Sequence, residues 1–227
     1  MMGRISFFVL FIISAGLLFS QESGFFRELS GTVEMQVSGS SVWVKAAQGD
    51  RIEKGTRIST GFKSTALIAL GDSVITVRPL TRLSLEEILR NDGDEQVNIY
   101  LHAGRIRADV SPPSGGKTNF TVRSPTVTAS VRGTSFEFDT VNLRVDEGRV
   151  QYVHANGSLV NVSKRETSYV DETDRRVVSP FEAAAASLTP ALPFGNTSGL
   201  PSGDTAPIID MGTVPTGDVG LGGFDWD

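Results

Sequence analysis

The stretch FTVRSPTVTASVRGTSFEFDTVNLRVDEGRVQY, residues 120–152, decides the fold because its apolar positions change from odd to even twice, each time across a glycine. These positions are odd-numbered from Val127 to Val131 and even-numbered at Phe136 and Phe138. Successive side chains of a strand point to opposite faces, so one flat strand cannot carry both patterns. The chain must therefore bulge or turn a corner within residues 132–134, where Gly133 tolerates the required backbone.

The parity returns to odd after Phe138, and the second change from odd to even occurs at Gly148. Leu143 and Val145 are odd-numbered, whereas Val150 and Tyr152 beyond the glycine are even-numbered. Short strands that meet at glycine corners do not suit one long flat sheet. The pattern predicts an all-β domain built as a rolled or solenoid-like stack of short strands.

The amino-terminal end has the pattern of a secretory signal peptide. In this chain of 227 residues, Arg4 precedes a largely apolar run over 5–19, and Ser20 follows it. Such a run falls short of the roughly 20 residues that span a bilayer, which argues against the alternative of an uncleaved anchor. We expect a signal peptide over 1–20, cleavage after Ser20, and a periplasmic or secreted protein with no membrane span after cleavage.

Composition narrows the chemistry further. The chain has no cysteine, which excludes disulfides, thiolate metal sites and a cysteine nucleophile. Residues 21–179 carry equal numbers of acidic and basic side chains, and residues 180–227 carry six acids and no base. Neither part has the basic stripe that phosphate binding requires, so nucleic acid is not an expected partner.

The chain divides into four parts by composition. After the signal peptide, residues 21–30 are expected to form a short lead-in with an aromatic pair, and residues 31–179 the β domain. Within residues 180–227, the segment FEAAAASL could hold two turns of helix. The remainder is rich in Gly, Pro, Ser and Thr and has little apolar surface to bury, so 180–227 is predicted to be a disordered acidic tail.

Six blocks in order give residues 31–169 a resemblance to the FecR domain, a periplasmic β module. The blocks are GDRI (49–52), GTRISTG (55–61), STA (64–66), FTVRSP (120–125), VRGTSF (131–136) and VDEGRV (145–150). Signalling members of this family add a transmembrane helix and a cytoplasmic anti-sigma segment. Here the signal peptide and the domain are nearly adjacent, so the resemblance implies the fold and the compartment without the anti-sigma activity.

The motif residues that the resemblance singles out are expected to be structural. They are Arg132, Gly133, Thr134, Glu147 and Gly148. Gly133 permits the corner, and Arg132 is expected to bridge strands through an ion pair with Glu147 or Asp139. The functional alternative makes Arg132 a contact for a ligand or partner.

No catalytic constellation is visible in the sequence. His102 and His154 are the two histidines, and they lack metal-ligand spacing and are expected to be exposed on strands. No Gly-x-Ser-x-Gly elbow occurs, and no pair of carboxylates stands apart as an acid and a base. We therefore expect no catalytic, cofactor or metal site, and a protein that is not an enzyme.

The last six residues, GGFDWD, place two aromatic side chains among acids at the end of the predicted tail. Such a segment can arise by chance in a low-complexity sequence and then has no function. The alternative is a short docking motif, which makes Phe224 and Trp226 candidate partner contacts.

Together these observations predict an exported, non-enzymatic module that binds an envelope protein or acts as a scaffold in the bacterial cell envelope. One alternative is the periplasmic part of a transmembrane, sigma-regulatory signalling pathway. Another is carbohydrate or cell-wall binding through exposed aromatic residues such as Trp43 and Tyr100.

Overall fold

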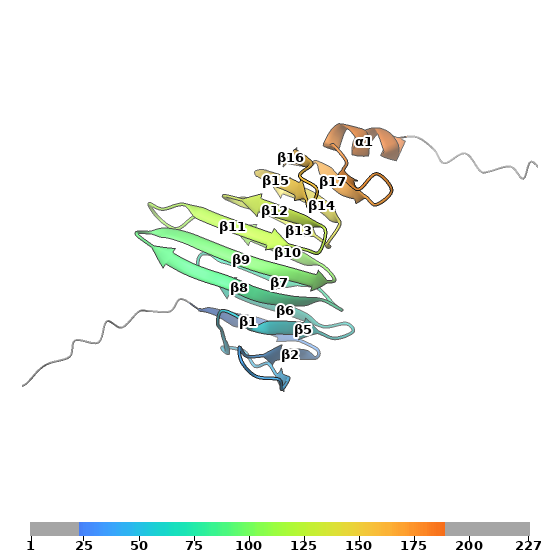
Figure 1. Cartoon of the computed structure of the whole chain (residues 1–227). Coiled ribbons are helices and arrows are strands. Elements are labelled where there is room, and N and C mark those ends of the chain that lie inside the picture. Colours follow the sequence, from blue (N-terminus) through green and yellow to red (C-terminus); the bar gives the residue numbers. More distant parts are fainter. Residues whose placement is uncertain (1–22, 189–227) are drawn as a thin grey trace, which may run out of the picture. The chain divides into compact units, whose positions relative to one another are not determined.

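The computed structural model describes residues 23–188, which form eighteen strands and one short helix. The strands assemble into two nine-stranded sheets, which we call sheet I and sheet II (Figure 1). The predicted signal peptide and the segment that holds Phe224 and Trp226 lie outside the described residues.

Sheet I contains nine strands in a fixed spatial order. Along the sheet they are β18 (Arg176–Val177), β17 (Thr167–Asp171), β14 (Asn142–Glu147), β13 (Thr134–Phe138), β10 (Ile106–Val110), β7 (Ser73–Val77), β6 (Thr65–Leu70), β1 (Gly24–Ser30) and β4 (Arg51–Ile52). All neighbouring strands of this sheet are antiparallel.

The strands of sheet II are also arranged from the C-terminal end of the domain to its N-terminal end. Its strands are, in order, β16 (Leu159–Ser163), β15 (Arg149–His154), β12 (Val127–Val131), β11 (Thr118–Arg123), β9 (Asp94–Ala103), β8 (Arg82–Asn91), β5 (Arg57–Thr60), β2 (Val33–Gln36) and β3 (Val44–Lys45). β9 and β11 are parallel, because β10 between them in the sequence belongs to sheet I.

The chain passes repeatedly from one sheet to the other. From β6 onward it adds strands to sheet I and sheet II in turn, and each addition lies beside the previous one in that sheet. Figure 1 shows this progress as a colour gradient from blue at β1 and β2 to orange at β17. The prediction of an all-β stack of short strands is confirmed.

The two sheets share one hydrophobic core. Strands such as β12 and β13 alternate buried and half-buried residues, which is the period of a sheet with one buried face. Two aromatic pairs bridge the sheets. Phe120 of sheet II and Phe136 of sheet I have ring centroids 6.5 Å apart, and Phe138 and Tyr152 have centroids 6.2 Å apart.

Residues 24–30 correct the expectation of a lead-in. They form β1, which pairs with β4 and β6, and the side chain of Phe26 is completely buried. The sequence signal was weak because Phe26 is followed by Arg27 and Glu28, so β1 lacks a clear alternation. Its pairing with β6 bridges a long stretch of chain, and local sequence reasoning does not reveal such a partner.

Residues 180–188 correct the upper boundary of the domain, because they form helix α1 (Pro180–Leu188). The Ser179 hydroxyl accepts a hydrogen bond from the Glu182 N–H, and the Glu182 carboxylate accepts one from the Ser179 N–H, which is a capping box. Hydrogen bonds from Arg176 and Ser179 lower the pKa of Glu182 to about 2. Ala183 is buried, so this first part of the predicted tail belongs to the folded domain.

Two truncations test this boundary. A chain that ends at Leu188 keeps every contact described above, so we expect its melting temperature to match that of the full chain. A chain that ends at Ser179 loses the ion pair between Arg176 and Glu182 and the burial of Ala183. We expect it to melt a few degrees lower, because the helix and its buried Ala183 are removed. Equal melting temperatures for the two truncations would contradict the assigned role of α1.

Candidate functional site: an arginine groove on sheet II

The two predicted glycine corners are confirmed, and they lie against each other. Gly133 joins β12 of sheet II to β13 of sheet I with φ of +129°, and Gly148 joins β14 to β15 with φ of +83°. A Cβ on Gly148 would lie 2.7 Å from the Gly133 carbonyl oxygen. The Thr134 hydroxyl donates a hydrogen bond of 3.1 Å to the Arg149 carbonyl. Gly133, Thr134 and Gly148 therefore serve to hold the two crossings together.

The same corners bring two arginines to one place on sheet II. Ser130 of β12 pairs with Gln151 of β15, and two positions further along each strand, toward the corners, come Arg132 and Arg149. A step of two residues keeps a side chain on the same face of a sheet. Both arginines line one shallow groove of about 470 Å³, which we call the arginine groove. Its other lining residues are Asn119, Ser130, Val131, Gln151 and Asn161.

The lining of the arginine groove is polar and carries only positive charge. Three amide side chains and one hydroxyl accompany the two guanidinium groups, and no carboxylate lines the groove. Within residues 23–188, neither Arg132 nor Arg149 has a side-chain hydrogen bond or an ion pair, and both are exposed. Guanidinium groups present a planar fork of N–H donors that matches carboxylate and phosphate oxygens. The arrangement is therefore suited to binding an anion.

The outer face of sheet I shows the opposite arrangement. Its arginines face carboxylates on and beside β10, β13 and β14, and the pairs Arg107–Asp146 and Arg105–Glu137 cross from one strand to another. The Nη and Nε nitrogens lie 3.0 Å from a carboxylate oxygen in Arg105–Asp139, 3.4 Å in Arg107–Asp109 and 3.4 Å in Arg144–Asp146. Charge is compensated on sheet I, whereas the two arginines of the groove have no ion pair, although Arg132 also borders a neighbouring pocket that holds Asp92, Asp94 and Glu95.

The expectation that Arg132 forms an ion pair with Glu147 or Asp139 is wrong, because both acids have other partners. Glu147 lies 2.9 Å from the Lys164 ammonium, and Asp139 lies 3.0 Å from the Arg105 guanidinium. Both acids belong to the sheet I side of the corners, whereas Arg132 leaves the end of β12 on sheet II. Arg132 therefore does not bridge the strands through either acid, and it lines the arginine groove instead.

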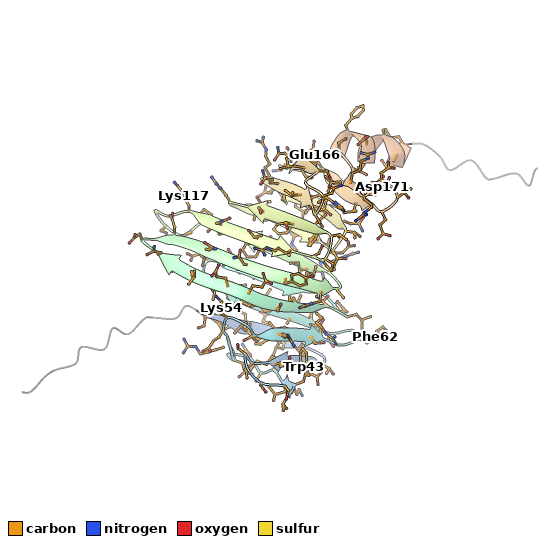
Figure 2. All side chains as sticks on the ribbon, in the orientation of Figure 1. Trp43, Lys54, Phe62, Lys117, Glu166 and Asp171 are labelled. Carbon is orange, nitrogen blue, oxygen red and sulfur yellow. The ribbon has the colours of Figure 1, made fainter. Side chains whose placement is uncertain are left out.

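The exposed aromatic residues do not form a common platform. Trp43 is half-buried, and its ring lies 5.8 Å from the Arg82 guanidinium carbon, whereas the ring of Tyr100 lies 4.7 Å from that of His102. Trp43 and Phe62 lie near the end of the stack that carries β2, far from α1 (Figure 2). Trp43 and Tyr100 are thus each in contact with a different neighbour.

Histidines and acids do not gather into a metal site in the described part of the chain. Within residues 23–188, no three His, Cys, Asp or Glu side chains lie close enough to hold an ion. His102 is exposed as expected, but His154 is only 7% exposed, and its Nδ1 accepts a hydrogen bond of 3.1 Å from the Asn156 N–H. None of the helices described over this range is long and apolar enough to cross a membrane.

Comparison with known families places the motifs in context. Residues 56–160 match the model of a family described as FecR protein. This chain contains a FecR domain. The matched residues run from the start of β5 into β16, and they include every residue of the arginine groove except Asn161. The FecR domain therefore supplies both corners and both arginines.

Two solved structures match part of this chain. Two crystal structures of a "putative anti-sigma factor" from Parabacteroides distasonis ATCC 8503 are 19% identical to this chain, with TM-scores of 0.46 and 0.45. Each match covers 54% of this chain and 57% of that one, so the FecR-domain chain spans little more than half of the solved protein. No curated protein matches significantly.

Sequence reasoning identified Arg132 but missed the rest of the arginine groove. Arg149 was visible in the block VDEGRV, as the residue directly after the second glycine corner. Its position beside Arg132 follows from the register of β12 and β15, which the sequence does not specify. Asn119, Gln151 and Asn161 are ordinary exposed strand residues until that register is known.

Proposed function

We propose that this chain is an exported, non-enzymatic FecR-domain protein that acts as a binding or scaffold module in the bacterial cell envelope. Its binding surface is the arginine groove. The observation that carries the proposal is the presence of Arg132 and Arg149 side by side, with no carboxylate among the residues that line the groove. Two neighbouring guanidinium groups repel each other, and a bound anion relieves that repulsion.

The strands that carry the groove residues suit a binding role. Six of its seven lining residues belong to β11, β12, β15 and β16, which are adjacent strands of sheet II, and Arg132 follows directly after the end of β12. Strands hold side chains in more exact positions than loops do. No step of the proposed role requires a cofactor, because binding alone uses the hydrogen-bond donors and charges already present.

A photo-crosslinking experiment in cells tests this function. A photoreactive amino acid at Gln151, inside the groove, is expected to give a covalent adduct with an envelope component. The matched control carries the same amino acid at Thr167, which is also exposed but lies on β17 of sheet I. Adducts formed equally from both positions, or from neither, would argue against the groove as the binding surface.

A signalling role is the second candidate, and the match to the FecR family favours it. In this role the domain relays an event at the outer membrane to an inner-membrane partner encoded elsewhere. The identity of the adduct from Gln151 separates the two candidates. An inner-membrane protein with a cytoplasmic segment supports signalling, and a surface component supports a scaffold.

A further inference from the structure

Beside the two arginines, the outer face of sheet II carries a row of neutral polar side chains in register. Thr121 pairs with Ser130, Ser130 with Gln151, and Gln151 with Asn161. These four residues, which we call the polar row, lie on four adjacent strands. Because neighbouring strands are about 4.8 Å apart, the polar row is about 14 Å long.

The side chains of the polar row are available to a ligand. None of the four makes a side-chain hydrogen bond within the described residues, and Gln151 and Asn161 are exposed. Amides offer both donors and acceptors, and hydroxyls do the same. On the neighbouring strand β9, the corresponding Asn98 instead donates a hydrogen bond of 2.9 Å to Glu87, so the free polar row ends there.

We propose that the arginine groove and the polar row together bind an anionic polysaccharide, a sugar chain that carries carboxylate or phosphate groups. This inference rests on the proposed function and names the ligand class of the same site. Sugar hydroxyls both donate and accept hydrogen bonds, which matches the evenly spaced amides and hydroxyls of the polar row. Arg132 and Arg149 supply paired donors for the acidic groups.

An acidic peptide fits this surface less well. Extended peptides gain affinity by pairing with the backbone of a free sheet edge, or by placing a large side chain in an apolar pocket. The groove is centred on β12 and β15, and each of these strands already has a partner on both sides. The free edge of sheet II is β16, which contributes Asn161 to the groove but carries neither of the two arginines. Val131 is the one apolar residue in the lining, so an aromatic anchor finds no pocket there. A hydroxyl-rich polymer needs neither feature.

Isothermal titration calorimetry with defined polymers tests the proposal. The protein used is the full chain without its predicted signal peptide. We expect binding of polygalacturonate or phosphomannan, weakened by added salt, and no binding of neutral dextran. Which of the two anionic polymers binds more tightly identifies the acidic group. The double variant Arg132→Gln/Arg149→Gln is expected to lose at least tenfold in affinity, because hydrogen bonds to charged groups are the stronger ones.

The matched control is Arg105→Gln/Arg144→Gln. It removes the same charge from two exposed arginines on the sheet I side, and each of them has a carboxylate partner. We expect its affinity to stay within twofold of the wild type. Equal losses in the two double variants would mean that binding follows net charge alone, and would overturn the proposed site.

The double variant Gln151→Ala/Asn161→Ala separates the sugar-binding inference from the proposed function. We expect it to bind polygalacturonate several-fold more weakly while keeping both arginines. Poly-glutamate is the peptide probe for the same site. If poly-glutamate bound as tightly as the polysaccharides and depended on Arg132 and Arg149, the groove would remain a binding surface but the ligand class would be wrong. If no anionic polymer responded to the arginine variants, both conclusions would fall.

Discussion

Gly148→Val is expected to destabilise the domain by about 3 kcal/mol or more, because the corner has room for neither the backbone conformation nor the side chain of valine. Gly148 has φ of +83°, which a β-branched residue adopts only with strain. Its Cβ would also lie 2.7 Å from both the Gly133 carbonyl oxygen and the Thr134 hydroxyl oxygen. Chemical denaturation followed by circular dichroism measures the loss.

Two other glycines separate the causes. Gly157→Val carries the same strain at φ of +92°, but no atom lies within 4 Å of its Cβ, so we expect a loss of about 1 to 2 kcal/mol. Gly133→Val, at φ of +129° and with only the Pro112 Cδ at 3.6 Å, is expected to cost about 2 kcal/mol. A Gly148 variant no less stable than the Gly157 variant would show that the contact between the two corners is unimportant.

Phe136→Ala is expected to cost about 3 to 5 kcal/mol, the range for removing a buried aromatic side chain. Phe136 is completely buried in β13, and its ring meets Phe120 of β11 at an interplanar angle of 74°. Alanine removes both the burial and this contact between the sheets. Domains are typically stable by about 5 to 15 kcal/mol, so this loss is a large share of the free energy of unfolding and should lower the urea midpoint markedly.

Phe62→Ala is the control for the aromatic substitution. Its side chain is 73% exposed, so we expect a change of less than about 0.5 kcal/mol. Phe136→Leu retains most of the apolar volume and should fall between the two. Urea midpoints that ranked the three variants in another order would mean that the core between the sheets is not centred on this aromatic pair.

The corners of the stack were predictable from sequence because they depend on local parity. A change from odd to even apolar positions across Gly133, and again across Gly148, requires the chain to leave one strand and start another. The structure shows what this means in space, since each corner moves the chain to the other sheet. Which sheet receives each strand depends on partners far away in sequence, and local patterns carry no information about them.

The incorrect expectations have the same origin. Glu147 was a reasonable partner for Arg132 by proximity in the motifs, but Lys164 reaches it from beyond β16. The helix over 180–188 had a local signal, because Ser179 followed three residues later by Glu182 is a capping box. Its attachment to the domain through Arg176 and Ala183 required the folded structure.

The order of the strands has a final consequence for self-association. An outermost strand exposes unpaired N–H and C=O groups, to which a second chain can add. Within residues 23–188, three of the four outermost strands, β3, β4 and β18, are only two residues long. β16, with five residues and an exposed Leu159, is the exception. Aggregation through strand addition therefore has one main starting point, and a lysine at Leu159 would block it without touching the core.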